Sequence, residues 1–193
     1  SIDSPAPGGG SVSALAGSLS ASLVSMVSNL SYNKKGYEKN NSKFEKLGIE
    51  AQNIKRKLLF LVDEDTRAFN CIMESFRLPK KTLEEKKYRD TMVEKATKNA
   101  IEVPLEIMKN SYASLLLAKK IAKIGNKNSL SDSGVSAELS ISSVNGAYMN
   151  VLINLLDIKD KKYAEKVRLT SSAIIKKSEK EITLIRSLIY KNL

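Results

Sequence analysis

Residues 4–23 read SPAPGGGSVSALAGSLSASL. Two prolines and three consecutive glycines lead directly into small and apolar residues, which predicts a loop and then a helix from about Ser11 to Ser31, with Ser11 or Ser13 as N-cap. A small face lets another backbone come close or leaves room for a ligand, and both interpretations stay open. The opposite face of this helix carries large apolar side chains: Val12, Leu15, Leu19, Leu23, Met26 and Leu30.

The rest of the chain continues the helical pattern, without alternating strand segments or hairpin dipeptides. Thr82 and Glu85 predict a capping box, and Pro104 should kink or break the helix that follows. Residues 1–193 are therefore expected to form one all-α domain, a multihelical bundle of about five long helices. The four further helices should cover about residues 44–76, 82–124, 131–156 and 160–190.

The composition indicates a globular protein. Hydrophobic residues make up 42% of the 193 residues and charged residues 27%, which is enough to bury a sizeable core. No uninterrupted apolar run approaches about 20 residues, so we expect no membrane-spanning helix and no membrane partner. The single cysteine, Cys71, suits a reducing compartment, and we expect the protein to be cytoplasmic.

The absence of histidine limits the chemistry of the chain. It excludes a histidine metal site, a Ser-His-Asp triad and a histidine base, so we expect no metal and assign acid–base work to carboxylates, lysine, tyrosine or the cysteine. The net charge of +11 fits either a solvated lysine-rich surface or a polyanionic partner. Aromatic residues are only 6% and no nucleic-acid motif is present, so nucleic acid is not the expected partner.

One carboxylate interrupts an apolar stripe. Asp65 lies three and four residues from apolar neighbours on both sides, on the face of Leu58, Leu61, Ala68, Phe69 and Ile72. A carboxylate on a core-facing stripe is costly unless it is paired, hydrogen-bonded or protonated. Asp65 is therefore a candidate for a perturbed pKa and for catalysis, and the alternative is a structural ion pair with a lysine of another helix.

Polar residues also interrupt the predicted helix over 131–156. Asn150 and Asn154 share one face of an otherwise apolar stretch. They could recognise another chain or a heterocycle through their amides, or they could bond one helix to the next. Asp132, in the first turn, could simply favour the helix N-terminus electrostatically.

Six segments, taken in order, resemble the cyclodeaminase/cyclohydrolase family: PAPGGGSVSALAGSLSASLVSMVSNL, LVDEDTRAFN, RLPKKTLEEK, VPLEI, GNKNSLSDSGVSA and GAYMNVLINLLDI. That family contains the C-terminal domain of formiminotransferase-cyclodeaminase, the stand-alone cyclodeaminases and the methenyltetrahydrofolate cyclohydrolases. Its members usually carry a short helix before the PAPGGGS segment, and almost nothing precedes that segment here. The formimino-transferring domain of the bifunctional members is also absent, so we expect no formimino transfer from glutamate.

The resemblance implies an all-helical fold that dimerises, with folate bound in a cleft near the subunit interface. It also implies a catalytic aspartate in the D-x-D-x-x-A-F segment, which here is Asp65. The stripe and the resemblance thus reach the same residue independently, which favours catalysis over an ion pair. The folate site is expected to be lined by Gly8, Gly9, Gly10, Ser11, Asp132, Asn150 and Asn154, with Lys34, Lys35 and Lys80 holding the glutamate tail.

The expected reaction is the conversion of 5-formimidoyltetrahydrofolate to 5,10-methenyltetrahydrofolate with release of ammonia, without a cofactor. Hydrolysis of 5,10-methenyl- to 10-formyltetrahydrofolate is the alternative within the same family. A basic helical adaptor for nucleic acid or an acidic protein is the alternative outside it. The expected partners are tetrahydrofolate, whose glutamate tail is often polymerised, and a second copy of the chain in a homodimer.

Overall fold

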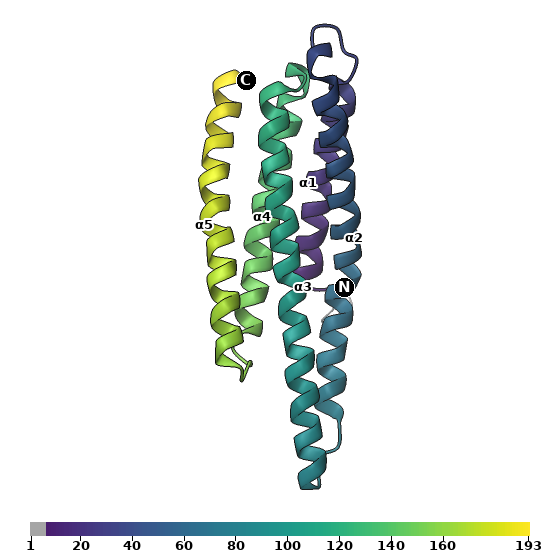
Figure 1. The fold of residues 1–193 in the computed structure, drawn as a ribbon, viewed down its shortest axis with the longest axis vertical. Helices are drawn as coiled ribbons and strands as arrows, with labels where there is room; N and C mark the ends of the chain where they lie inside the picture. Colours follow the sequence, from purple (N-terminus) through teal and green to yellow (C-terminus); the bar gives the residue numbers. More distant parts are fainter. Residues whose placement is uncertain (1–6) are drawn as a thin grey trace.

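A computed structural model describes residues 7–193 as an all-α bundle, as predicted (Figure 1). Helix α1 packs along α2 and α4, α3 contacts both of these, and α5 covers α3 and α4. The lower parts of α2 and α3 run on past the start of α1 as a two-helix arm. The elements are α1 (Gly9–Ser31), η1 (Glu38–Asn40), α2 (Asn41–Arg77), α3 (Leu83–Ile124), η2 (Lys127–Ser129), α4 (Leu130–Asn154) and α5 (Lys161–Asn192).

The helix ends correct two predictions and confirm a third. Helix α1 begins at Gly9 after the extended residue Gly8, so the expectation that Ser11 or Ser13 caps it is wrong. The capping box of Thr82 and Glu85 is confirmed. Helix α3 continues through Pro104 without a break, because a helix with long packed flanks can tolerate the loss of one backbone donor.

The small face of α1 lies inside the bundle, so close packing is the confirmed interpretation. Ser20 is fully buried, and its hydroxyl lies 2.7 Å from that of Ser114 on α3 and 2.6 Å from that of Ser140 on α4. A Cβ on Gly17 would come within 2.5 Å of the Ser111 hydroxyl, and one on Gly146 within 2.3 Å of the Ser13 hydroxyl. Small residues therefore let three helix backbones approach closely, and their hydroxyls bond to one another.

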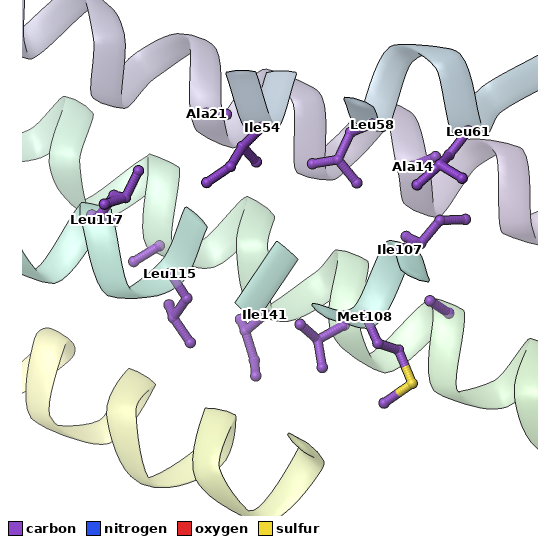
Figure 2. Close-up of a cluster of buried hydrophobic side chains, with 14 of the residues drawn as sticks. Ala14, Ala21, Ile54, Leu58, Leu61, Ile107, Met108, Leu115, Leu117 and Ile141 are labelled. Atoms are coloured by element: carbon purple, nitrogen blue, oxygen red, sulfur yellow. The ribbon is translucent and has the colours of Figure 1, made fainter. Parts of the chain in front are cut away.

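Larger apolar side chains fill the space on either side of this seam. Figure 2 shows such side chains of α2, α3 and α4: Leu58 lies close to the small residues of α1, whereas Ile141 points toward α5. By length and composition α1 could span a membrane, but 61% of its most apolar window is buried inside the bundle, as in the core helix of a helical domain.

The large apolar face of α1 points outward. Val12 is 62% exposed, Leu19 48% and Leu30 52%. The small face is not available to a ligand or to another chain, because the protomer buries that face itself. The protomer leaves the large apolar face uncovered instead.

Candidate active site

The site is built where the first turn of α1 meets the middle of α2. The Asp65 carboxylate accepts a hydrogen bond from the backbone N–H of Ser11 (2.8 Å) and lies 3.0 Å from the Ser11 hydroxyl. That hydroxyl has one proton, which the carbonyl of Val62, also 3.0 Å away, shares with the carboxylate. Ser11 therefore positions the Asp65 carboxylate through its backbone and its side chain.

This geometry replaces the lysine ion pair that was the alternative for Asp65. Asp65 makes no ion pair with the residues from 7 to 193. The first N–H groups of a helix have no acceptor within the helix and carry a partial positive charge. A carboxylate placed against them is held without a cation, and one oxygen remains for other chemistry because both Ser11 contacts go to Oδ2.

Gly10 makes room for the carboxylate. A Cβ at Gly10 would lie 2.0 Å from Oδ1 of Asp65 and 2.5 Å from its Cγ. Gly10 is buried, whereas Gly9 is exposed and a Cβ there would meet only the Asn150 amide, at the ordinary contact distance of 3.4 Å. The two glycines therefore have different roles. Gly10 leaves the space that the Asp65 carboxylate occupies, and Gly9 leaves the solvent-exposed side of the turn uncovered.

Asn150 approaches the same helix end from α4. Its amide nitrogen donates to the carbonyl of Gly146, 2.9 Å away, which leaves the amide oxygen without a hydrogen-bond partner among residues 7–193. The Asn150 amide lies against Gly9, and the free Asp65 oxygen lies against the next residue, Gly10. Together they provide two acceptors for N–H groups of a ligand.

Asn154, which shares a face with Asn150 in the sequence pattern, has a structural role. Its amide nitrogen donates to the carbonyl of Ala100, 2.7 Å away on α3. In an unbroken helix that carbonyl accepts from the N–H four residues later, and that residue is Pro104, which has none. Asn154 thus satisfies the acceptor that Pro104 leaves open.

Four other predicted site residues lie far from Asp65 in this protomer, which corrects their grouping. Lys34 and Lys35 follow the C-terminal end of α1, about 30 Å from its first turn at about 1.5 Å per residue. Asp132 lies about 27 Å from Asn150 along α4 by the same measure. Lys80 lies at the tip of the arm, in the turn that joins α2 to α3. These residues are separated because they lie at or beyond the opposite ends of long helices.

A second polar cluster joins α3 to the start of α5, away from α1. Lys98 pairs with Asp160 at 2.8 Å, and this hydrogen bond raises the pKa of Lys98 and lowers that of Asp160. Burial, together with the hydrogen bond to Glu102, raises the pKa of Tyr163. Asp160 also accepts from the N–H of Tyr163, so the cluster caps α5 and fastens it to α3.

The described residues, 7–193, contain no group of three cysteine, aspartate or glutamate side chains arranged to hold a metal ion. The site at the start of α1 offers a carboxylate, helix N–H groups and an amide. These groups can accept a proton, return it and orient a ligand that carries N–H groups.

Sequence comparison identifies the family of the chain. The family model described as formiminotransferase-cyclodeaminase matches residues 1–173. The formimidoyltransferase-cyclodeaminase of Gallus gallus is 36% identical over 191 residues, which is 97% of this chain and 35% of that protein. The methenyltetrahydrofolate cyclohydrolase of Methylorubrum extorquens is 34% identical over 161 residues, 83% of this chain and 77% of that protein.

A solved structure agrees with these relatives. The crystal structure of formiminotetrahydrofolate cyclodeaminase from Thermotoga maritima superimposes with a TM-score of 0.81 at 28% identity, over all of this chain and 90% of that one. The chain spans about a third of the length of the formimidoyltransferase-cyclodeaminases that it matches. Sequence and fold agree: the chain belongs to the formiminotransferase-cyclodeaminase family.

Proposed function

We propose that this chain converts 5-formimidoyltetrahydrofolate to 5,10-methenyltetrahydrofolate and releases ammonia. The observation that carries the proposal is the position of the Asp65 carboxylate. Ser11 holds it against the first turn of α1, and it fits there because Gly10 has no side chain. The names of the relatives and of the structural neighbour support the same substrate class.

The reaction requires one group that accepts a proton and later donates it. N10 of the folate attacks the protonated formimino carbon on N5 and forms a tetrahedral centre. Asp65 takes the proton from N10 and delivers it to the departing nitrogen. Ammonia then leaves with the electron pair of its bond to carbon, the positive charge stays on the methenyl bridge, and Asp65 is a carboxylate again. Proton and charge therefore balance without a metal or a redox cofactor.

Positioning supplies the remaining catalysis. Nucleophile and electrophile belong to one molecule, so the enzyme must hold the conformer in which N10 faces the formimino carbon. The open turn at Gly9 and the free amide oxygen of Asn150 would receive the N–H groups of the reduced pterin. We further propose that the chain acts as a cytoplasmic homodimer and that lysines bind a glutamate tail, which would use part of the net charge of +11.

Cyclohydrolysis of the methenyl bridge is the second candidate. It is favoured by the relative of Methylorubrum extorquens, because this chain covers 77% of that protein. In that reaction Asp65 would remove a proton from the water that attacks the bridge carbon. Both candidates use the same carboxylate and the same one-carbon unit.

One experiment separates the candidates. The purified protein is given 5-formimidoyl- or 5,10-methenyltetrahydrofolate, and ammonia and the methenyl absorbance are followed. Cyclodeaminase activity releases ammonia as the absorbance rises, and cyclohydrolase activity lowers the absorbance of the second substrate. Loss of neither substrate above the blank would refute both proposals.

A further inference from the structure

A basic pocket lies at the end of the bundle where α2 begins. Figure 1 shows the loop after α1, the connection from α3 to α4 and the C-terminus together at this end. The pocket opens between the start of α2 and the ends of α3 and α5, and its volume is about 830 Å³. Lys43 on its wall is about 33 Å from Asp65 along α2, so the pocket is separate from the candidate active site. Four lysines line it: Lys39, Lys43, Lys123 and Lys127.

The four ammonium groups of this pocket have no anionic partner in the described part of the chain, residues 7–193. The lysines that pair with a carboxylate there are others: Lys98, Lys109, Lys119 and Lys159. The carboxylates closest to the pocket in sequence, Glu38, Glu45 and Asp132, lie outside its lining. Cations gathered around one cavity without a counter-charge repel one another, and a bound anion would remove that repulsion.

Two of these lysines lie where the helix dipole disfavours a cation. Lys43 is in the first turn of α2, and Lys39 is in the η1 turn just before it. The first turn of α2 contains no acidic residue, and its N-cap, Asn40, makes no hydrogen bond to it through the side chain. A helix N-terminus carries a partial positive charge, so the two lysines add to this charge instead of balancing it.

Tyr37 contributes a further donor to the lining. Its hydroxyl oxygen accepts a hydrogen bond from the backbone N–H of Lys127, 3.1 Å away. The hydroxyl proton has no acceptor among residues 7–193, so it is available to a ligand. Apolar side chains form the rest of the wall, and they strengthen the attraction between the lysines and an anion because they keep the local dielectric low.

We propose that this basic pocket binds a small molecule that carries two or more phosphate groups. The lining residues from the described part of the chain include no arginine, whose planar fork matches a carboxylate, whereas lysine binds phosphate as a point charge from any direction. Four lysines on separate segments can reach several phosphates at once, which a single anionic group cannot use. The proposal does not rest on the proposed function.

Binding of a defined polyphosphate tests this assignment. Inorganic tripolyphosphate, titrated into the full chain in a calorimeter, should bind more tightly than inorganic phosphate, because it reaches more of the lysines. Lys39→Gln/Lys43→Gln should weaken this binding by about tenfold or more, as expected when one or more hydrogen bonds between charged groups are lost. Lys123→Gln/Lys127→Gln, on the α3 side of the pocket, should weaken it by a similar factor.

The matched control is Lys176→Gln/Lys180→Gln on α5. It removes the same charge from exposed positions that do not line the pocket, so it should bind tripolyphosphate as the wild type does. Equal weakening in the control and in the pocket variants would show non-specific attraction to a chain of net charge +11 and overturn the proposal. Absence of binding to the wild type would also overturn it, as would tighter binding of penta-γ-glutamate than of tripolyphosphate, which would make this a carboxylate site.

Thermal stability separates a binding role of the lysines from a structural one. Without ligand, Lys39→Gln/Lys43→Gln should melt at the same temperature as the wild type or higher, because it removes cations from a helix N-terminus. Tripolyphosphate should raise the melting temperature of the wild type more than that of this variant, since only the folded wild type binds it tightly. A ligand-free variant that melts below the wild type would show that the lysines stabilise the fold themselves, and would overturn the proposal.

Discussion

Replacing Gly10 by alanine tests whether the glycine loop exists to admit Asp65. The added methyl group would lie 2.0 Å from Oδ1, 2.5 Å from Cγ and 2.7 Å from Oδ2 of that side chain. No carbon atom fits at these distances, and the methyl is fixed to the buried backbone of α1. The carboxylate must therefore leave its position and lose its contacts with the N–H and hydroxyl of Ser11.

The size of the effect follows from those contacts. A hydrogen bond to a charged group contributes about 1.5–3 kcal/mol. Ser11 makes two such contacts to Asp65, and the shorter, from its N–H, has no other acceptor once the carboxylate leaves. Alanine recovers at most about 1 kcal/mol of helix propensity over glycine. Gly10→Ala should therefore lower the free energy of unfolding by roughly 1–3 kcal/mol, and the melting temperature by about 2–4 °C per kcal/mol. Turnover should fall by about 10²–10⁴-fold, as for loss of a general acid–base group.

Urea unfolding and turnover of the purified variant measure both effects. Gly9→Ala is the matched control, since its methyl meets only the Asn150 amide at 3.4 Å and should leave the stability nearly unchanged; weaker folate binding by that control would place Gly9 in the binding surface. In a Gly10→Ala/Asp65→Ala double variant the clash disappears, so the stability cost of Gly10→Ala should shrink. Wild-type stability and turnover in Gly10→Ala would refute the steric argument.

Three further predictions concern single side chains. Asp65→Asn should keep the fold and folate binding and lose about 10²–10⁴-fold in turnover; near wild-type turnover would remove Asp65 from the mechanism. Asn154→Ala should lower the free energy of unfolding in urea by about 1–3 kcal/mol, because the carbonyl of Ala100 loses its donor, with folate affinity unchanged in the folded protein; a loss of affinity alone would make it a ligand residue instead. The bond to Arg186 lowers the pKa of Glu138, so this pair stabilises the fold above the unfolded value of 4.5 and the contribution is lost as the pH falls through the lowered folded value. Glu138→Gln should therefore destabilise the protein at pH 7, by about 0.5 kcal/mol for so exposed a pair, but not at pH 3. A difference in melting temperature between wild type and variant that is the same at pH 3 and at pH 7 would contradict this prediction.

Asp65 could be found from sequence because a charged side chain on an apolar stripe is costly to bury and therefore needs a specific partner or a function. The period of the surrounding apolar residues places Asp65 toward the core without knowledge of any other helix. Its partner could not be found, because Ser11 lies 54 positions away and any serine or lysine of the bundle satisfies the same requirement. The same holds for Asn154. Pro104 predicts that the carbonyl four residues earlier lacks a backbone donor, but only the packing of α4 on α3 shows which amide donates to it.

The sequence by itself determined the helices of this protein. Apolar periodicity and the Thr82–Glu85 box act over a few residues, and they predict five helices within a few positions of the observed ends, although the break expected at Pro104 does not occur. It also showed that α1 has two unlike faces, but not which of them is buried. Tertiary structure decided that, because the serines and glycines of the small face bring α3 and α4 closer than leucines would allow and leave the large side chains outside. It also decided which predicted site residues meet, since a helix of 23 residues holds its two ends about 35 Å apart.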